Sequence, residues 1–407
     1  MPNEFFSRPR VVSGMRPTGP LHLGHLHGVL KNWVELQEDH DCFFFVADLH
    51  ALTTHYQDCR EISPYTLEML AAWLAVGVDP QKATLFIQSW VPAHAELFAL
   101  LSMIAPLGWL ERVPTYKDQK EALSEKDLNT YGFLGYPLLQ AADVLLYDAD
   151  AVPVGEDQVA HLELCREVAR HFNHLFGAVP DLEDRVREEA KHLGEEGAKK
   201  YFSLCRRHGE KGDATSLEEV RALLRSAGMG KNAWAVLWGY FLGKRIEILK
   251  EPQALLARTS KLPGLDGRKM AKSYYNFIGL KDKPEDIEKR MRAMVTDPAR
   301  KRRSDPGNPH LCPVWSFHEV YSDGATKSQV TEGCTQAKIG CLECKAPVIG
   351  KVTQEVAAIG GRIEAFLQNR RELLDIAEEG AKRAGEVAQE VLLRSKRAMG
   401  LAEQPEV

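Results

Sequence analysis

The sequence has none of the features that are typical of membrane, secreted or highly charged proteins. No apolar run in its 407 residues reaches the roughly 20 positions of a membrane-spanning helix, and the N-terminal MPNEFFSRPR has no apolar core of a secretory leader. A strong excess of one charge is also missing. The formal net charge of −5 excludes coating of nucleic acid by the whole chain but permits a local basic track. We expect a cytoplasmic protein of two or three domains, without membrane contact.

Cysteine is sparse over most of the chain and dense in one polar segment. Four of the eight cysteines are Cys312, Cys334, Cys341 and Cys344, spaced C-x21-C-x6-C-x2-C, which in a cytosolic chain indicates a metal site before disulfides. A structural zinc site usually takes two close pairs, whereas only the last two cysteines form one here. Pro313 follows the first cysteine and glycines precede two others, which leaves backbone N–H groups able to approach cluster sulfurs. This pattern favours a four-iron cluster, with Zn²⁺ as the alternative.

Strands and helices alternate in the first half of the chain. Residues 11–14, 42–53 and 83–89 are apolar runs typical of buried strands, and helical patterns separate them, the first opening at His22. This order predicts an α/β fold with a doubly wound parallel sheet. In such sheets ligands bind beyond the carboxyl ends of the strands, where SGMRPTG follows the first strand.

Two short motifs carry the chemistry. In LHLGH, His22 and His25 flank Gly24 at the start of a helix, where unpaired N–H groups and imidazole donors suit a phosphate. Far downstream, KMAKS places Lys269 and Lys272 three residues apart in a loop, as mobile charges able to hold a leaving pyrophosphate. Either motif alone is a weak signal, but the pair predicts a nucleotide site for phosphoryl chemistry.

Together the motifs resemble those of class I aminoacyl-tRNA synthetases. The stretches SGMRPTGPLHLGH, VADLHALT, ATLFIQSWVPAHAEL, YPLLQAADVLLYDADAVPVGEDQ and GRKMAKS are most similar to the bacterial tryptophanyl-tRNA synthetase family. The resemblance covers residues 11–176 and 259–402. It implies a Rossmann-like catalytic domain of the HUP type, a homodimer, activation of L-tryptophan by ATP with Mg²⁺, and transfer to the 3′ end of tRNA(Trp).

The resemblance also implies the residues of the ATP site. His22, His25, Lys269 and Lys272 would stabilise the α-phosphate transition state, while the substrate carboxylate is itself the nucleophile. Ala271 departs from the serine usual in the family motif, with little expected consequence. The implied ATP-binding residues are Arg16, Pro17, Thr18, Gly24, His25, Gly155, Glu156, Asp157, Lys269, Met270, Ala271, Lys272 and Ser273.

Asp143 is the candidate for recognition of the amino acid. A carboxylate inside the apolar run LLQAADVLLY is costly unless it is paired or exposed, so it is either held by a nearby backbone group or kept as an acceptor. The resemblance implies that it accepts the indole N–H of tryptophan. It further implies Tyr136 and Gln158 near the ammonium and carboxylate. His50, Val152 and Val154 would line the pocket, although His50 is equally compatible with a core histidine.

Three alternatives stay open. Tyr136, Gln140 and Asp143 also match the tyrosine-binding pattern of tyrosyl-tRNA synthetases, but Val12 stands where that family has a tyrosine. A small-cofactor adenylyltransferase would lack KMAKS. A non-catalytic, synthetase-like RNA-binding or redox protein would have no physical need to keep both motifs together with Asp143.

The C-terminal part is expected to meet tRNA. Its TDPARKRRSDPGNPHLCP stretch and four cysteines resemble the subset of the family that carries a 4Fe–4S cluster near the anticodon region. Residues 281–303 hold nine Lys or Arg against five Asp or Glu, and such a run either faces solvent or contacts phosphates. The predicted division is a catalytic domain (1–176), a helical insertion (177–258), the KMAKS loop (259–283) and a helical anticodon-binding domain with the cysteines (284–407). Within the insertion, the face carrying Trp234, Trp238 and Tyr240 is expected to form its own small core.

Overall fold

A computed structural model describes residues 8–113, 127–155, 159–178, 181–211, 214–256 and 262–401. By its internal contacts the chain divides into two compact units. The first unit comprises Met1–Ser13, Val91–Leu255 and Lys382–Val407, and the second comprises Gly14–Trp90 and Leu256–Ala381.

A five-stranded sheet has the strand order β3-β2-β1-β4-β5. The β1–β4 and β2–β3 pairs are parallel. Starting at β1, the order runs outward to β3 on one side and to β5 on the other, which is the arrangement of a doubly wound sheet. The predicted α/β class is therefore confirmed. The strands are β1 (Arg10–Met15), β2 (Asp41–Val46), β3 (Ala83–Ile87), β4 (Ala151–Val154) and β5 (Gln253–Leu256).

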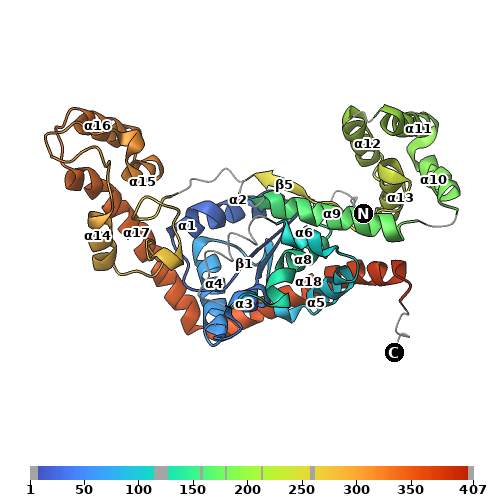
Figure 1. The fold of residues 1–407 in the computed structure, drawn as a ribbon, viewed down its shortest axis with the longest axis horizontal. Helices are drawn as coiled ribbons and strands as arrows, with labels where there is room; N and C mark the ends of the chain where they lie inside the picture. The colour runs from blue at the N-terminus through green and yellow to red at the C-terminus, as the bar shows by residue number, and fades with distance from the viewer. Residues whose placement is uncertain are drawn as a thin grey trace. The chain divides into compact units, whose positions relative to one another are not determined.

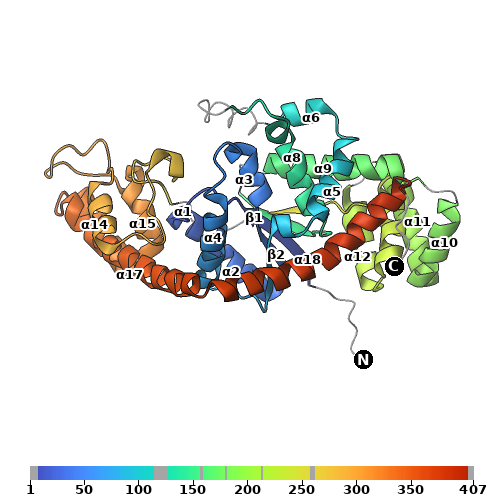
Figure 2. The same cartoon turned by 90° about the horizontal axis from the view of Figure 1, so that it is seen from below.

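The second unit surrounds its strands with helices and continues into a helical group. Helices α14, α15 and α16 gather around the first half of the long α17 in both views (Figures 1 and 2). The elements are α1 (Leu23–His25), η1 (Leu26–Leu30), α2 (Lys31–Asp39), α3 (Asp48–His55), α4 (Ile62–Val76), η2 (Gln88–Trp90), η5 (Lys272–Tyr274), α14 (Pro284–Ala293), η6 (Pro309–Leu311), α15 (Pro313–Tyr321), α16 (Gly324–Thr335) and α17 (Cys341–Gln368).

One predicted strand is shorter than its apolar run. Residues 42–53 were expected to be extended throughout, but β2 ends at Val46 and α3 begins at Asp48. The Asp48 carboxylate accepts the backbone N–H groups of Leu49 and Ser89, both at 3.0 Å, and its charge is favourable in the first turn of a helix. The second half of the run is therefore helical, and Asp48 is its first residue.

The first unit holds the middle of the chain, and its helices α10 to α13 form a separate group (Figure 1). Buried residues of this group, including Trp238, form a core of their own, against which Trp234 and Tyr240 pack, as the aromatic pattern predicted. The elements are α5 (Ala93–Ser102), α6 (Leu107–Glu111), α8 (Tyr131–Leu145), α9 (Val159–Phe176), α10 (Leu182–Ala190), η4 (Lys191–Leu193), α11 (Gly194–Lys211), α12 (Ala214–Ser226) and α13 (Lys231–Gly243). The last helix, α18 (Arg370–Ala398), crosses from the second unit into the first.

No helix within the described ranges has the length and apolar character needed to cross a membrane.

Candidate active site

The first motif forms a small network of backbone and imidazole groups. His22 is the N-cap of α1, and its Nδ1 accepts the N–H of Gly24 at 3.1 Å. The backbone N–H of His22 in turn donates to Nδ1 of His25 at 3.2 Å. Because Nδ1 of each ring is an acceptor, the proton of each neutral imidazole is assigned to Nε2. The two rings, with centroids 3.8 Å apart, thus keep one N–H donor each for a ligand.

Gly24 is required by its neighbour. A Cβ at this position would lie 2.9 Å from Cε1 and 3.0 Å from Nδ1 of the His22 ring. Its N–H also lies 3.3 Å from Sδ of Met270, which is buried. The glycine that sequence reasoning assigned to phosphate approach therefore has a packing role as well.

Backbone pairing joins the two motifs. His22 forms an antiparallel bridge with Gly279. The N–H of Leu23 donates to the carbonyl of Ile278 at 3.0 Å, and the N–H of Leu280 donates to the carbonyl of Leu21 at 2.9 Å. The signature segment (residues 21–30) and the lysine loop (residues 262–280) are thus held together although about 250 positions separate them in sequence.

Asn276 organises the lysine loop, and the motif search missed it. Its Oδ1 accepts the N–H of Ala271 at 2.9 Å, and its Nδ2 donates to the carbonyl of Lys269 at 3.1 Å and to Asp266 at 2.7 Å. The side chain is buried, and a Cβ on Gly264 would lie 2.2 Å from its Nδ2. No sequence signal marked it, because its burial is a property of the fold; once buried, such a side chain has to be hydrogen-bonded.

Lys272 reaches back to the turn that precedes the signature segment. Its Nζ donates to the carbonyl of Gly19 at 2.7 Å. Gly19 has φ +134°, a conformation open to glycine, and a Cβ there would lie 3.1 Å from Cδ of Lys272. The second lysine of the motif is therefore held close to the signature segment, while Lys269 is exposed.

The electrostatics of this cluster disfavour additional positive charge. Burial, followed by the charge of Lys272, lowers the pKa of His22 to about 3. Burial, His22 and Lys272 together hold the pKa of His25 well below its ordinary value. Burial, followed by the charge of Arg16, lowers the pKa of Lys272 to about 8. At neutral pH the cluster presents uncharged imidazole donors beside a single ammonium that an anion would stabilise.

The other predicted nucleotide residues divide into three groups. Pro17 is buried, Thr18 is half-buried and donates its N–H to the carbonyl of Arg16 at 2.9 Å, and Arg16 is exposed. Gly155 is exposed and belongs to the first unit. The remaining predictions, Glu156, Asp157 and Gln158, lie outside the described residues, as does the side chain of Ser273.

Asp143 lies in the first unit and is paired with a side chain, that of His94. Only 1% of its surface is exposed, and its Oδ1 lies 2.7 Å from Nδ1 of His94. Nε2 of His94 lies 2.7 Å from the hydroxyl of Tyr147. With the carboxylate ionised, Nδ1–H donates to Asp143 and the tyrosine hydroxyl donates to Nε2. Burial and then the charge of Asp143 hold the pKa of Tyr147 well above its ordinary value.

Sequence reasoning missed His94 and Tyr147, although both lie in quoted stretches. Neither belongs to a recognised motif: His94 is 49 positions before Asp143, and Tyr147 is four positions after it. The remaining predicted pocket residues of this unit are buried: Tyr136 on α8, and Val152 and Val154 on one face of β4. The Tyr136 ring lies 5.9 Å from that of His161, which is hydrogen-bonded to Gln140 at 2.7 Å. His50, the last predicted member, is buried in the second unit.

The four clustered cysteines carry free thiols within electrostatic range of one another. Burial, followed by the charges of the other three, raises the pKa of Cys344 to about 12. Nη1 of Arg300 lies 3.8 Å from Sγ of Cys334, and a Cβ on Gly307 would lie 2.6 Å from that sulfur. Among the described residues, however, no group of three or more His, Cys, Asp or Glu side chains is placed to hold a metal ion. The donor chemistry fits a thiolate-ligated group, but the side chains do not stand in an ion site.

Comparison with known proteins assigns the family. The tRNA synthetases of class I (W and Y) match residues 6–186 and 235–355 of this chain. The chain therefore belongs to the class I tRNA synthetases of the tryptophan and tyrosine branch, and the family prediction is confirmed. Within that branch it belongs to the tryptophan–tRNA ligases. It is 56% identical to the tryptophan–tRNA ligase of Ralstonia nicotianae over 96% of this chain and 98% of the relative.

Other relatives agree with this assignment. The Thermotoga maritima tryptophan–tRNA ligase is 42% identical over 96% of this chain and 99% of its own length. The tryptophanyl-tRNA synthetase of Campylobacter jejuni, solved in complex with ADP and tryptophan, superimposes with a TM-score of 0.70 at 26% identity. That alignment covers 96% of this chain and 100% of the solved one.

Proposed function

We propose that this chain activates L-tryptophan with ATP to form tryptophanyl-adenylate and pyrophosphate, and then transfers the amino acid to the 3′ end of tRNA(Trp) in the cytoplasm. Family membership supports the reaction. The observation that carries the assignment of residues is the backbone-paired cluster of His22, His25 and Lys272, which gathers three donors for an anion in one place.

The chemical step needs no nucleophile from the protein. The carboxylate of tryptophan attacks the α-phosphorus of ATP, the bond to the β-phosphate oxygen breaks, and pyrophosphate leaves. The Nε2–H groups of His22 and His25 donate to oxygens whose negative charge grows in the transition state. Lys272 and the exposed Lys269 neutralise the departing pyrophosphate. Mg²⁺ bound to the nucleotide supplies further charge neutralisation on the phosphate oxygens.

Asp143 is proposed as the acceptor for the indole N–H. His94 occupies Oδ1 of its carboxylate and fixes the orientation of the group. A buried acceptor of this kind discriminates strongly, because a substrate without the matching donor leaves a carboxylate unpaired. We propose Tyr136 and Gln158 at the ammonium and carboxylate of the amino acid, with Val152, Val154 and His50 at the walls of the pocket.

Amino-acid-dependent exchange of pyrophosphate into ATP tests the reaction directly. The purified chain is assayed with each of the 20 amino acids, without tRNA and with Mg²⁺. Exchange with tryptophan alone supports the proposal. Exchange with tyrosine would favour the tyrosyl alternative, and no exchange by folded protein would leave the non-catalytic RNA-binding alternative.

We propose that Cys312, Cys334, Cys341 and Cys344 hold a 4Fe–4S cluster, with Zn²⁺ as the alternative occupant. Four free, mutually influencing thiols support this, since such thiols are the ligands of both groups. Protein purified without oxygen is analysed for iron, sulfide, zinc and visible absorption. About four irons and four sulfides with a broad brown band would support the cluster, whereas one zinc in colourless protein would replace it.

The predicted domains follow from this function. We propose residues 1–176 as the catalytic domain, 177–258 as an insertion, 259–283 as the loop completing the ATP site, and 284–407 as the domain that meets the anticodon. The basic run supplies part of the tRNA contact. However, Arg300 is 9% exposed and donates to the carbonyls of Arg303 and Ile339, so it stabilises the fold rather than facing phosphates.

We propose a homodimer that pairs through the first unit. Three large apolar side chains on elements next to one another are highly exposed: Met103 at 76%, Leu107 at 62% and Tyr131 at 61%. Burial against a second copy would remove this apolar surface from water. Light scattering tests the assignment: we expect a dimeric wild type and a monomeric Leu107→Asp variant. A Leu107→Asp variant that stays dimeric would contradict the proposed surface.

A further inference from the structure

A polar bridge joins the signature segment to two helices of the C-terminal part. Nε2 of His27, two residues after His25, lies 2.7 Å from the hydroxyl of Tyr321 at the end of α15. That hydroxyl donates to Oε2 of Glu355 on α17 at 2.6 Å. The other carboxylate oxygen, Oε1, accepts from Nζ of Lys31 at 2.9 Å. One carboxylate thus holds both His27 and Lys31, which lie four residues apart.

The Glu355 carboxylate of the bridge is stabilised in its ionised form. Burial alone would raise the pKa of Glu355, but hydrogen bonds from His27, Tyr321 and Lys31 outweigh burial and lower it to about 2. The His27 side chain is 3% exposed and that of Glu355 is 25% exposed. Charge-assisted hydrogen bonds in such partly buried surroundings are stronger than those between neutral groups.

The contact lies at an unusual point of the backbone. Leu26–Leu30 forms a π-helical turn, inserted between the α-helical residues Leu23–His25 and α2. Such wide turns are rare and occur often at functional sites. A change to ordinary α-helical pairing would rotate the residues before the turn relative to α2, and these residues include His22 and His25.

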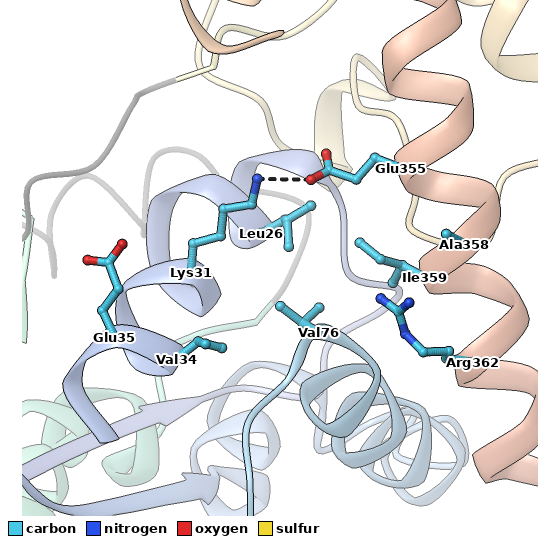
Figure 3. Close-up of a pocket in the computed structure, with 9 residues that line it drawn as sticks. All are labelled: Leu26, Lys31, Val34, Glu35, Val76, Glu355, Ala358, Ile359 and Arg362. Atoms are coloured by element: carbon cyan, nitrogen blue, oxygen red, sulfur yellow. Dashed lines mark hydrogen bonds and ion pairs between the residues drawn. The ribbon is translucent and has the colours of Figure 1, made fainter. Parts of the chain in front are cut away.

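An open cavity of about 320 Å³ lies next to the bridge, and residues of the signature segment, α2, the end of α4 and α17 line it. Figure 3 shows Leu26 and Lys31 on one side of the cavity and Glu355 and Ile359 on the other, with the Lys31–Glu355 ion pair crossing at one end. Beside this cavity, the contacts of Glu355 with Lys31 and Tyr321 are directional links between the signature segment, α15 and α17.

The helices that supply the bridge are themselves anchored. His318 of α15 lies with Nε2 3.1 Å from the carbonyl of Cys344 on α17. Lys345 of α17 donates to the carbonyl of Arg292 at the end of α14. Helix α15 begins directly after Cys312, and α17 begins at Cys341. Tyr321 and Glu355 therefore project from a braced pair of helices whose first turns carry cysteines.

We propose that Glu355 and Tyr321 are positioning residues for amino-acid activation, which act through His27 by holding the π-helical turn so that His22 and His25 face the α-phosphate. This inference rests on the ATP site proposed above. It assigns to the C-terminal helices an indirect part in the chemical step, through the position of His22 and His25, before tRNA is bound.

The test compares Glu355→Gln and Tyr321→Phe with the wild type in tryptophan-dependent pyrophosphate exchange without tRNA. Each variant keeps the shape of its side chain and loses the charge or the hydroxyl. We expect kcat to fall ~10-fold, because small misplacement of groups that act in the transition state is costly. The KM for tryptophan is expected to stay within twofold, since the residues proposed to bind it are elsewhere. A merely structural role would lower the melting temperature without this split.

Arg362→Ala is the matched control. Arg362 lies on the same helix and lines the same cavity, and its Nε donates to the carbonyl of Ala75 on α4. It does not touch the signature segment in any described contact. We expect this variant to keep wild-type kcat even if its melting temperature falls. Equal losses of kcat in Arg362→Ala and Glu355→Gln would overturn the proposal.

A double-mutant cycle separates the possible failures. Combining His27→Gln with Glu355→Gln is expected to cost no more in kcat than the larger single effect, because both act through one bridge. Additive losses would show that Glu355 does not act through His27. Lys272→Ala is measured in parallel. If Lys272→Ala keeps wild-type exchange, the proposed ATP site and this inference both fail; if it loses exchange while Glu355→Gln does not, only this inference fails.

Discussion

The cluster of His22, His25 and Lys272 in the second unit, proposed to bind ATP and called the ATP cluster below, differs in its electrostatics from the Asp143 network of the first unit. Around Lys272 the imidazoles are kept uncharged, and no described contact in the cluster brings a carboxylate to the His22 and His25 rings. Around Asp143 a negative charge is kept in the interior by His94 and, behind it, Tyr147. The first arrangement suits an incoming anion, and the second suits a neutral N–H donor.

The two sites also differ in how they hold their groups. The ATP cluster depends on backbone pairing between distant segments and on two close approaches at Gly19 and Gly24. The Asp143 network depends on side chains packed between α5 and α8, with less than 2% of Asp143 or His94 exposed. The groups proposed to meet ATP are thus held by paired backbone segments, and the group proposed to meet tryptophan is held in the interior. Substitutions in one site should therefore change the kinetics for one substrate and not for the other.

The largest effect is expected from Lys272→Ala. Removing the ammonium leaves the charge on the departing pyrophosphate without one of its partners, so kcat for tryptophan-dependent exchange should fall by ~10³-fold. The KM for tryptophan should stay near the wild-type value, as should far-UV circular dichroism. A loss of less than tenfold would mean that Lys272 is not part of the reacting site.

Asp143→Asn should impair tryptophan binding and leave ATP binding unchanged. The amide keeps the shape of the carboxylate but removes its charge, so the KM for tryptophan is expected to rise by ~10²-fold. The KM for ATP should not change, because the nucleotide cluster contains no part of this network. If both KM values rose together, the two sites would not be independent.

His94→Gln should give a smaller effect of the same kind. The carboxylate keeps its charge and loses the group that orients it, so the KM for tryptophan should rise by ~10-fold. Because His94 is buried, the substitution is also expected to lower the stability of the fold. Thermal unfolding is therefore measured with and without tryptophan. A variant that is destabilised but binds tryptophan normally would reduce His94 to a packing role.

The smallest expected effect is a dependence of the exchange kinetics on pH, caused by titration of Lys272. The pKa of Lys272 is lowered to about 8, so the lysine is mostly protonated at pH 7 and loses its proton as the pH rises through 8. We expect kcat/KM for ATP in tryptophan-dependent exchange to fall by up to ~10-fold between pH 7 and pH 9, because the protonated fraction of Lys272 falls. This fall should be absent in Lys272→Arg, whose side chain stays charged. A pH-independent kcat/KM for ATP in the wild type would contradict this charge assignment.

The sequence predicted that LHLGH and KMAKS act together, and the fold pairs the two segments; that they bind ATP stays a prediction. Spacing within LHLGH and KMAKS places each donor within a few residues of the next, and local backbone geometry does the rest. Asn276 escaped notice because its role is to satisfy the backbone of Lys269 and Ala271, which only the folded loop reveals. The strand predicted at 42–53 was too long, because an apolar run by itself does not show where a strand ends and a buried helix begins.

The roles of the two motifs and of Asp143 stay predictions, whereas the chain's order of residues was enough to determine the class of fold, the family and the separate core that contains Trp238. These depend on periodicity and on residue types that are costly to bury without a purpose. The pairing of Asp143 with His94 and the bridge from Glu355 to His27 were decided by tertiary structure alone. Each depends on the approach of groups between 49 and about 330 positions apart, and no local pattern encodes such an approach.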